Sequence, residues 1–266
     1  MPWSWAALMP HPPIIVPEVG RGRERDASAT VGGIDKIMKR LGKMGKPDRI
    51  LLASPHQPYI SGCLAINKTG FLKGSFASFG APSITFDLRT DLDSADSLRG
   101  FLSAAGVPVS FSESADMTRD QGSTVPLYFL KKAYGELPHV VLVSPIGLDA
   151  ASAHGLGQAL ARFDDGCSWG FIASGDLSHR LKPGAPAGFS PDGGRFDLAV
   201  VESVGKCDAS IILNLPERVV EDAGECGMRS ALALVGLVSS LGGKIDVLSY
   251  EGPFGVGYCN ALWIKE

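Results

Sequence analysis

The chain has 266 residues, of which 45% are hydrophobic and 20% charged, and its net charge at pH 7 is −3. This balance is ordinary for a globular protein with a sizeable core, and we predict a single domain over residues 1–266. Lysine and arginine are scattered rather than clustered, which argues against a nucleic-acid or anionic-membrane partner.

The five cysteines and the N-terminal segment bear on the cellular compartment. The cysteines are odd in number, lie far apart and form no C-x-x-C pair, which argues against a disulfide framework and a structural zinc knuckle. The N-terminal segment has no basic region and is interrupted by prolines, so we expect no signal peptide. No apolar run reaches the length of a membrane span. These features predict a cytoplasmic protein.

Two predicted strands near the beginning of the chain each end in a histidine flanked by prolines. Residues 3–9 form an apolar run that stops at Pro10-His11-Pro12-Pro13. A helical pattern then ends near Gly42, and a second apolar run, residues 49–54, leads into Pro55-His56-Gln57-Pro58. Proline restricts the backbone around it, so each imidazole is expected on a stiff segment. Such a segment suits a metal ligand, although histidines between prolines also occur in plain surface loops.

Helices and strands are expected to alternate in the middle of the chain. Residues 59–86 are rich in Gly, Ser and Phe and are predicted to form short strands or a hairpin that could cover a site. Helices are predicted over 96–105 and 125–134, and the second follows a polar loop that contains Asp120-Gln121-Gly122. Apolar runs at 107–111 and 139–144 have the composition of strands.

The segment from Phe171 to Arg180 joins a buried strand to a polar turn. Phe171-Ile172-Ala173 suits a buried strand, and Ser174-Gly175-Asp176 has the composition of a tight turn, with His179 shortly after it. A surface loop in which Asp176 caps a helix is the alternative interpretation. Ligands of open α/β sheets gather outside the carboxyl ends of the strands, so a histidine at this position is well placed for chemistry.

Glu225 comes just before the last long helix. Helices are predicted over 196–207 and 216–223, and residues 231–241 form an almost wholly apolar helix. A carboxylate is favoured at the N-terminus of a helix, but close to the apolar interior it needs a cationic partner, for which a metal ion would serve. A helix-terminal carboxylate without a ligand is the alternative. Two strands between Val247 and Ile264 complete the chain.

These elements predict a three-layer α/β/α domain with a mixed, largely parallel central sheet. The carboxyl ends of parallel strands meet at one edge, so His11, His56 and His179 are expected to share a crevice. Two histidines and one carboxylate on one face of an octahedral ion are the ligands of non-haem Fe(II) oxygenases. A zinc hydrolase would instead combine the first two histidines and one water with Cys226 or Glu225.

Five short motifs resemble the catalytic B-subunit family of class III extradiol ring-cleaving dioxygenases, and in particular its branch related to Memo proteins. The motifs follow one another from residue 9 to residue 257: Met9-Pro10-His11-Pro12-Pro13, Ser54-Pro55-His56, Ser174-Gly175-Asp176-Leu177-Ser178-His179-Arg180, Ala223-Gly224-Glu225-Cys226-Gly227 and Glu251-Gly252-Pro253-Phe254-Gly255-Val256-Gly257. Each is short, but together their order and spacing are specific for the superfamily. They do not specify a substrate.

The resemblance implies a non-haem Fe(II) enzyme that opens the ring of a catechol-type aromatic with O₂. It implies that His11, His56 and Glu225 bind the iron and that His179 is the acid/base beside it, which helps to deprotonate the diol. From its spacing alone, Asp176 is expected either to orient His179 or to shape the pocket. The residues expected to line the substrate pocket are Pro12, Asp120 and Gln121.

Two departures from the family pattern leave alternatives open. The family commonly has Asp-His-Gly where this chain has Asp120-Gln121-Gly122, so a pocket histidine is replaced. Memo-like relatives use a cysteine near the position of Cys226, which could replace Glu225 as ligand and favour zinc or copper. The alternatives to ring cleavage are a Memo-like metal-binding protein that acts through a partner, and a zinc hydrolase. The resemblance is also compatible with a homodimer or a companion subunit.

Overall fold

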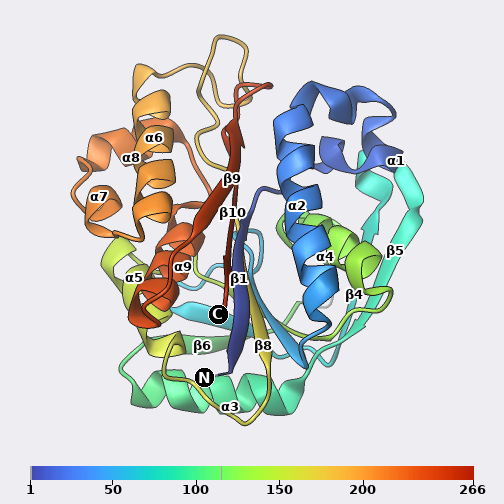
Figure 1. Cartoon of the computed structure of the whole chain (residues 1–266), viewed down its shortest axis with the longest axis vertical. Coiled ribbons are helices and arrows are strands. Elements are labelled where there is room, and N and C mark those ends of the chain that lie inside the picture. The colour runs from blue at the N-terminus through green and yellow to red at the C-terminus, as the bar shows by residue number, and fades with distance from the viewer. Residues whose placement is uncertain (1, 115) are drawn as a thin grey trace.

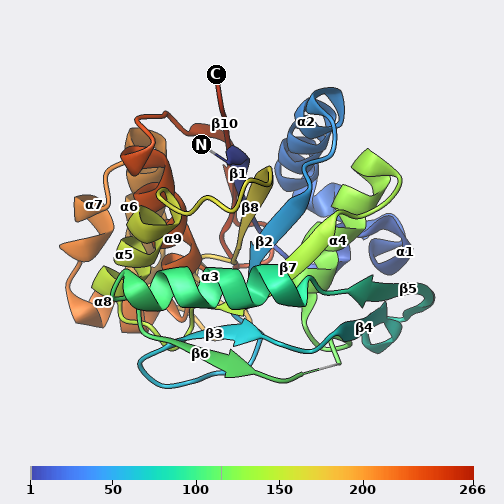
Figure 2. The same cartoon turned by 90° about the horizontal axis from the view of Figure 1, so that it is seen from below.

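The computed structural model describes residues 2–114 and 116–266. They form a central sheet with helices packed on both of its faces (Figures 1 and 2), which confirms the predicted mixed α/β/α fold. Within these residues the sheet has eight strands in the order β6-β3-β7-β2-β8-β1-β10-β9. The strands are β1 (Trp3–Met9), β2 (Arg49–Ala53), β3 (Leu64–Asn67), β6 (Val109–Ser112), β7 (His139–Ser144), β8 (Trp169–Ser174), β9 (Asp246–Glu251) and β10 (Tyr258–Ile264).

The centre of this sheet is parallel, and antiparallel strands flank it. β7, β2, β8 and β1 run parallel to one another. β3 runs antiparallel to β7, and β10 runs antiparallel to β1 and β9. In β1, Ala6 and Leu8 face one core while Ala7 and Met9 face the other. A strand buried on both faces has a continuous apolar sequence, which is why the central strands were predictable.

Helices cover the two faces unequally. One face carries α2 (Ser28–Met44) and α4 (Gln121–Tyr134), next to a small sheet formed by the hairpin of β4 (Phe71–Phe76) and β5 (Ala81–Arg89). The other face carries α3 (Leu92–Ala104), α5 (Ala150–Leu160), α6 (Pro191–Lys206), α7 (Ser210–Leu213), α8 (Glu217–Ala223) and α9 (Met228–Ser240). The short helix α1 (Pro17–Gly20) and three 3₁₀ turns (Pro13–Ile15, Arg23–Ala27 and Ala77–Phe79) lie in connections. No helix of the described residues is both long and apolar enough to cross a bilayer.

Polar side chains set where several helices begin. Asp91 and Asp120 each accept a hydrogen bond from the backbone N–H three residues ahead, and so form the N-caps of α3 and α4. These helices begin at Leu92 and Gln121, four residues before the predicted starts at 96 and 125. The predicted starts are late because Asp93-Ser94 in α3 and Gln121 to Thr124 in α4 carry little hydrophobic signal.

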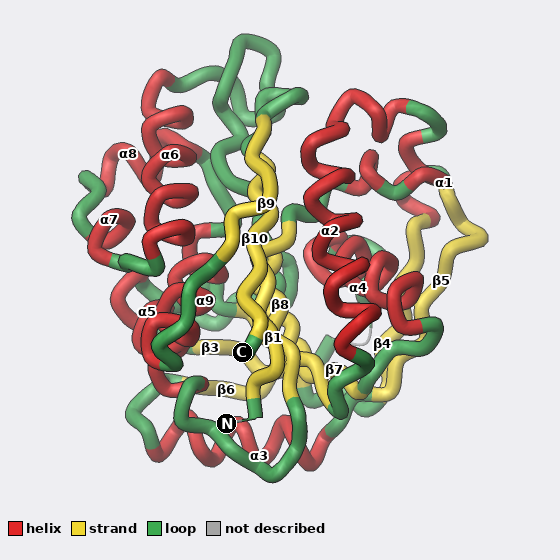
Figure 3. The backbone as a smooth tube through the Cα atoms, in the orientation of Figure 1, coloured by secondary structure: helices red, strands yellow, loops and turns green. Residues whose placement is uncertain are grey.

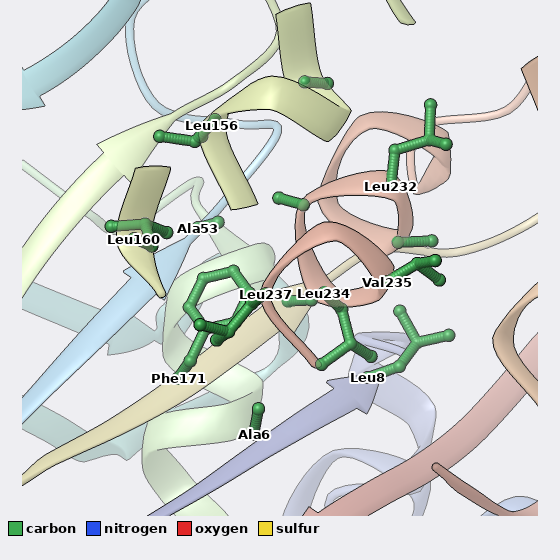
Figure 4. Packing of buried hydrophobic residues seen from close by; sticks show 14 of the residues in the cluster. Ala6, Leu8, Ala53, Leu156, Leu160, Phe171, Leu232, Leu234, Val235 and Leu237 are labelled. Atoms are coloured by element: carbon green, nitrogen blue, oxygen red, sulfur yellow. The ribbon is translucent and has the colours of Figure 1, made fainter. Parts of the chain in front are cut away.

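The helix α9 fills the core on its side of the sheet. It packs against β1 and β8, with Leu234 and Leu237 beside Phe171 (Figure 4). The neighbouring helix α5 approaches it closely at Gly157. A Cβ atom on Gly157 would overlap the carbonyl oxygen of Ala233 in α9, so only glycine allows this approach.

We predict that Gly157→Ala destabilises the protein by about 1–3 kcal/mol, because the added methyl group forces the two helices apart. Gly155 lies in the same helix and has open space around its Cβ position. Gly155→Ala is therefore the matched control and should stabilise the fold by about 0.5–1 kcal/mol through helix propensity. Free energies of unfolding from urea titrations compare the two variants. Equal effects would contradict the close packing of α5 on α9.

Candidate metal site

The carboxyl ends of β1, β8 and β2 meet at one edge of the sheet. The three strands are adjacent and parallel, with Met9 paired to Ser174 and Ala53 paired to Ala173. The segments that follow them carry His11, His56 and the turn with Asp176 and His179. Figure 3 shows the long irregular connection from β8 to α6 that begins at this edge. The sheet register thus gathers the histidines that the sequence placed at separate strand ends.

Three side chains at this edge form a group that could hold a metal ion. The Nε2 atoms of His11 and His56 are 3.1 Å apart, and the Sγ atom of Cys226 is 3.6 Å from Nε2 of His11. All of these donor atoms lie within 4.8 Å of one another. His11 is buried, Cys226 is partly buried and His56 is exposed, so the group is open to solvent on the side of His56.

Hydrogen bonds hold His11 with its Nε2 atom toward this group. Its Nδ1 lies 2.9 Å from the hydroxyl of Ser174, and its backbone N–H donates to Oδ1 of Asp176 at 2.8 Å. Burial, and then the neighbouring His56, hold the pKa of His11 well below its usual value. The imidazole is therefore neutral at pH 7, the form that binds a metal. The second carboxylate oxygen of Asp176 lies 3.9 Å from Nε2 of His11, but a neutral ring makes no ion pair with it.

A buried carboxylate anchors the loop that carries His56. Asp120 accepts hydrogen bonds from the side chains of Ser54 (2.7 Å) and Gln57 (2.6 Å), which stand on either side of His56. It also accepts from the amide and the hydroxyl of Ser123, at 2.9 and 2.5 Å. The amide of His56 in turn donates to the Ser54 hydroxyl at 3.2 Å. Both oxygens of Asp120 are thus occupied in positioning the loop.

The other expected pocket residues lie beside the two histidines. Gln121 is half-buried at the start of α4, and the next residue, Gly122, packs against the His56 loop, where a Cβ atom would lie 3.1 Å from Cδ2 of His56. Pro12 is buried next to His11 in the chain. Contact of Pro12, Asp120 or Gln121 with a substrate stays a prediction.

Cys226 reaches the group because its turn lies directly on the turn after β8. The amide of Asp176 donates to Sγ of Cys226 at 3.3 Å, and the amide of Cys226 donates to the carbonyl of Asp176, also at 3.3 Å. Glycine makes this approach possible, since a Cβ atom on Gly175 would overlap Cα of Gly227. Burial, and then Asp176, raise the pKa of the Cys226 thiol well above its usual value, so without a metal it is protonated.

Both carboxylate oxygens of Glu225 interact with residues at the start of α9. Its Oε2 accepts the amide N–H of Met228 at 2.6 Å, and its Oε1 lies 3.7 Å from the guanidinium of Arg229. The expected cationic partner is therefore present, but it is an arginine. Glu225 does not belong to the metal-capable group of the described residues, which contains Cys226 instead. The assignment of Glu225 as a ligand stays a prediction, and the donor geometry favours the alternative.

His179 is held by its backbone, while its ring has unused hydrogen-bonding capacity. Its amide donates to the carbonyl of Ala223 at 3.0 Å, whereas its Nδ1 is buried without a hydrogen-bond partner in the described part of the chain. The ring lies within electrostatic range of the site: after burial, His179 is among the causes that shift the pKa of both His11 and Asp176. Burial raises the pKa of Asp176 to about 6.

Asp197 of α6 is a buried residue that the sequence did not single out. Its Oδ1 accepts the amide N–H of Ser178, the residue before His179, at 2.7 Å. Its Oδ2 accepts the hydroxyl of Tyr250 at 2.9 Å. Burial raises the pKa of Asp197 to about 7. The sequence did contain a sign of this role, because Asp197 is an acidic residue within the apolar stripe of the helix predicted over 196–207. A charged side chain is rare there unless it has a partner.

Comparisons with known proteins support a common ancestry over most of the chain. A protein of Clostridium acetobutylicum, CA_C1420, is 32% identical over 261 residues, which cover 94% of this chain and 55% of that protein. This chain thus spans about half the length of that curated relative. The crystal structure of the uncharacterized protein JW3007 from Escherichia coli K12 has the same fold, with a TM-score of 0.63 and 15% identity over 97% of this chain and 99% of that one.

The match to a protein family extends over nearly the whole sheet and all the candidate ligands. Residues 5–260 fit the model of the family described as the catalytic LigB subunit of aromatic ring-opening dioxygenase. The matched range includes both histidines of the donor group, Cys226, and the turn with Asp176 and His179. The chain therefore belongs to the LigB family of aromatic ring-opening dioxygenase subunits.

Proposed function

We propose that this protein is a metal-dependent extradiol dioxygenase that opens the ring of a catechol-type aromatic, with His11, His56 and Cys226 as the metal ligands. The observation that carries the proposal is the convergence of two imidazole nitrogens and one thiol within 4.8 Å at the carboxyl edge of the parallel strands. Membership of the LigB family supports the reaction class. We propose Fe(II) as the metal.

The donor group fits a metal ion in its chemistry and in its surroundings. The contact between Nδ1 of His11 and Ser174 supports Nε2 as the ring nitrogen that would coordinate the metal. The thiol of Cys226 would lose its proton on binding, as thiol ligands do. When bound, Fe(II) would supply a Lewis-acid centre for the diol and a binding place for O₂. The three protein ligands leave positions open for both.

The remaining residues of the site have roles in binding and proton transfer. A planar diol would approach from the exposed side, where His56 meets solvent. His179 would accept a proton from a substrate hydroxyl and later return it, because its ring is near the donor group. Asp176 would keep His11 in place through the backbone amide of that residue.

The thiol supports a second candidate function. Two histidines and a cysteine with an open fourth position are also ligands of catalytic zinc, and thiolates favour softer metals than carboxylates do. The same site would then belong to a zinc hydrolase, or to a Memo-like metal-binding protein that acts through a partner. Metal content and oxygen uptake separate these functions from ring cleavage.

The test of the proposed function is oxygen consumption by the anaerobically purified protein after Fe(II) is restored. We expect uptake of O₂ with at least one member of a panel of catechols and aminophenols, together with the visible absorbance of a ring-opened product. The zinc-loaded protein is the control and should consume no O₂. Tightly held zinc as purified, with no uptake across the panel after iron loading, would contradict ring cleavage.

We predict that Cys226→Ala lowers the affinity for Fe(II) by at least about tenfold, because it removes one of three protein ligands. Glu225→Gln is the matched control at the adjacent position. It should keep the metal and lose only about 1 kcal/mol or less of stability, since its ion pair with Arg229 is partly exposed and glutamine still accepts the Met228 amide. Titrations of the two variants with Fe(II) compare their metal affinities. Loss of iron in Glu225→Gln alone would identify Glu225 as the ligand.

We predict that His179→Phe retains iron but lowers kcat by roughly 10²- to 10⁴-fold, the usual contribution of a general acid/base. His139→Phe changes an exposed histidine at the amino end of β7 and is the control, with unchanged turnover expected. Metal analysis and steady-state kinetics compare the two. If His179→Phe lost its iron, His179 would belong among the ligands.

A further inference from the structure

We propose that Asp197 is a positioning residue for His179, acting through the backbone amide of Ser178. This inference rests on the proposed function of His179 as the proton-transfer group of the site. Asp197 lies on α6, which follows the long connection from β8, and its side chain is completely buried. It would therefore act without touching the substrate or the metal.

The first observation is that His179 has no hydrogen bond through Nδ1 to fix its ring. His11 provides the contrast, because its Nδ1 is bonded to Ser174. Nδ1 of His179 is buried and has no partner among the described residues. A histidine that must present one nitrogen to a reaction usually has the other nitrogen bonded to a carboxylate or a carbonyl. Here the direction of the ring depends on how the backbone is held.

The second observation is that the backbone around His179 is clamped from two sides. On one side, the amide of His179 and the hydroxyl of Ser178 both donate to the carbonyl of Ala223, at 3.0 and 2.9 Å. On the other side, the amide of Ser178 donates to Oδ1 of Asp197 at 2.7 Å. The Ala223 contacts hold the turn against the end of α8, and Asp197 holds the peptide unit between Leu177 and Ser178, which directly precedes the unit that carries the His179 amide.

The third observation is that Asp197 is itself held rigidly. Its Oδ2 accepts the hydroxyl of Tyr250 in β9, and a Cβ atom on Gly257 would overlap the same oxygen. The carboxylate thus lies between α6, β9 and the turn after β8, with no room for a rotamer change toward Gly257. None of its hydrogen-bond partners is a cation. A buried carboxyl group without a cationic partner contributes little to the stability of a fold. The role left to Asp197 is therefore to orient the groups that donate hydrogen bonds to it.

The test compares Asp197→Ala with Asp197→Asn in the full chain. Asparagine keeps an oxygen that can accept the Ser178 amide, whereas alanine does not. The readout is the ring signals of ¹⁵N-labelled histidine in the metal-free protein, with His179 assigned from the spectrum of His179→Phe. We expect Asp197→Ala to shift or broaden the His179 signals, and Asp197→Asn to restore most of the original position. Unchanged His179 signals in Asp197→Ala would overturn the proposal.

Two further variants separate a specific effect of Asp197 on His179 from a general loss of stability. Asp91→Ala removes another carboxylate that caps a helix and pairs with Arg49, and it should lower stability without moving the His179 signals. Tyr250→Phe removes one hydrogen bond to Asp197 and provides a milder variant if Asp197→Ala does not fold. We expect it to move the His179 signals in the same direction but less. A shift of these signals in Asp91→Ala of the same size would refute a specific role of Asp197.

The iron-loaded protein gives an independent readout. Asp197→Ala should lower kcat by roughly 10- to 100-fold, as expected for a displaced catalytic group, with iron content and KM unchanged. Loss of iron in this variant would contradict the proposal. If the wild-type protein consumes no O₂ while the His179 signals still respond to Asp197, the proposed ring cleavage fails and the positioning role stands.

Discussion

Buried carboxylates fix the loops at the carboxyl edge of the sheet, and the candidate site depends on them. Asp176 accepts the backbone amide of His11, and Asp120 binds the side chains on either side of His56. Asp197 accepts the backbone amide of the residue before His179. Each of these carboxyl groups is buried, so its desolvation must be offset by the hydrogen bonds it accepts. The donors at the site are thereby held before any ligand arrives.

The sheet and the glycines provide the geometry that these carboxylates stabilise. Adjacent parallel strands bring their carboxyl ends to one edge, and a one-residue slip of a central strand would exchange the side chains that pack into the two cores. Gly175 and Gly227 then allow two turns that are distant in sequence to lie against each other. This contact delivers Cys226 to the two histidines. The contact between the two turns is rigid because it is made by backbone atoms and not by flexible side chains.

The nature of the third ligand links the geometry to the chemistry. A thiolate passes more electron density to a metal than a carboxylate does and favours softer ions. Cys226 would therefore change both the preferred metal and its reactivity relative to a site of two histidines and a carboxylate. Glu225, at the next position, stabilises the start of α9 instead. On the proposed assignment, the two neighbours in sequence have separate roles: Cys226 binds the metal and Glu225 stabilises the start of α9.

The sequence alone predicted the central strands and the longer helices, although not where α3 and α4 begin, because strands buried on both faces have continuous apolar runs and helices have apolar stripes. It also predicted that His11, His56 and His179 would share one crevice, since each follows a strand and parallel strands end at one edge, and His11 and His56 do lie in contact. Only the tertiary structure showed that Cys226, and not Glu225, lies with the donor atoms of His11 and His56, because adjacent residues in a turn point in different directions. It alone placed Asp197 against the backbone amide of Ser178, since no local pattern predicts a contact across 19 residues.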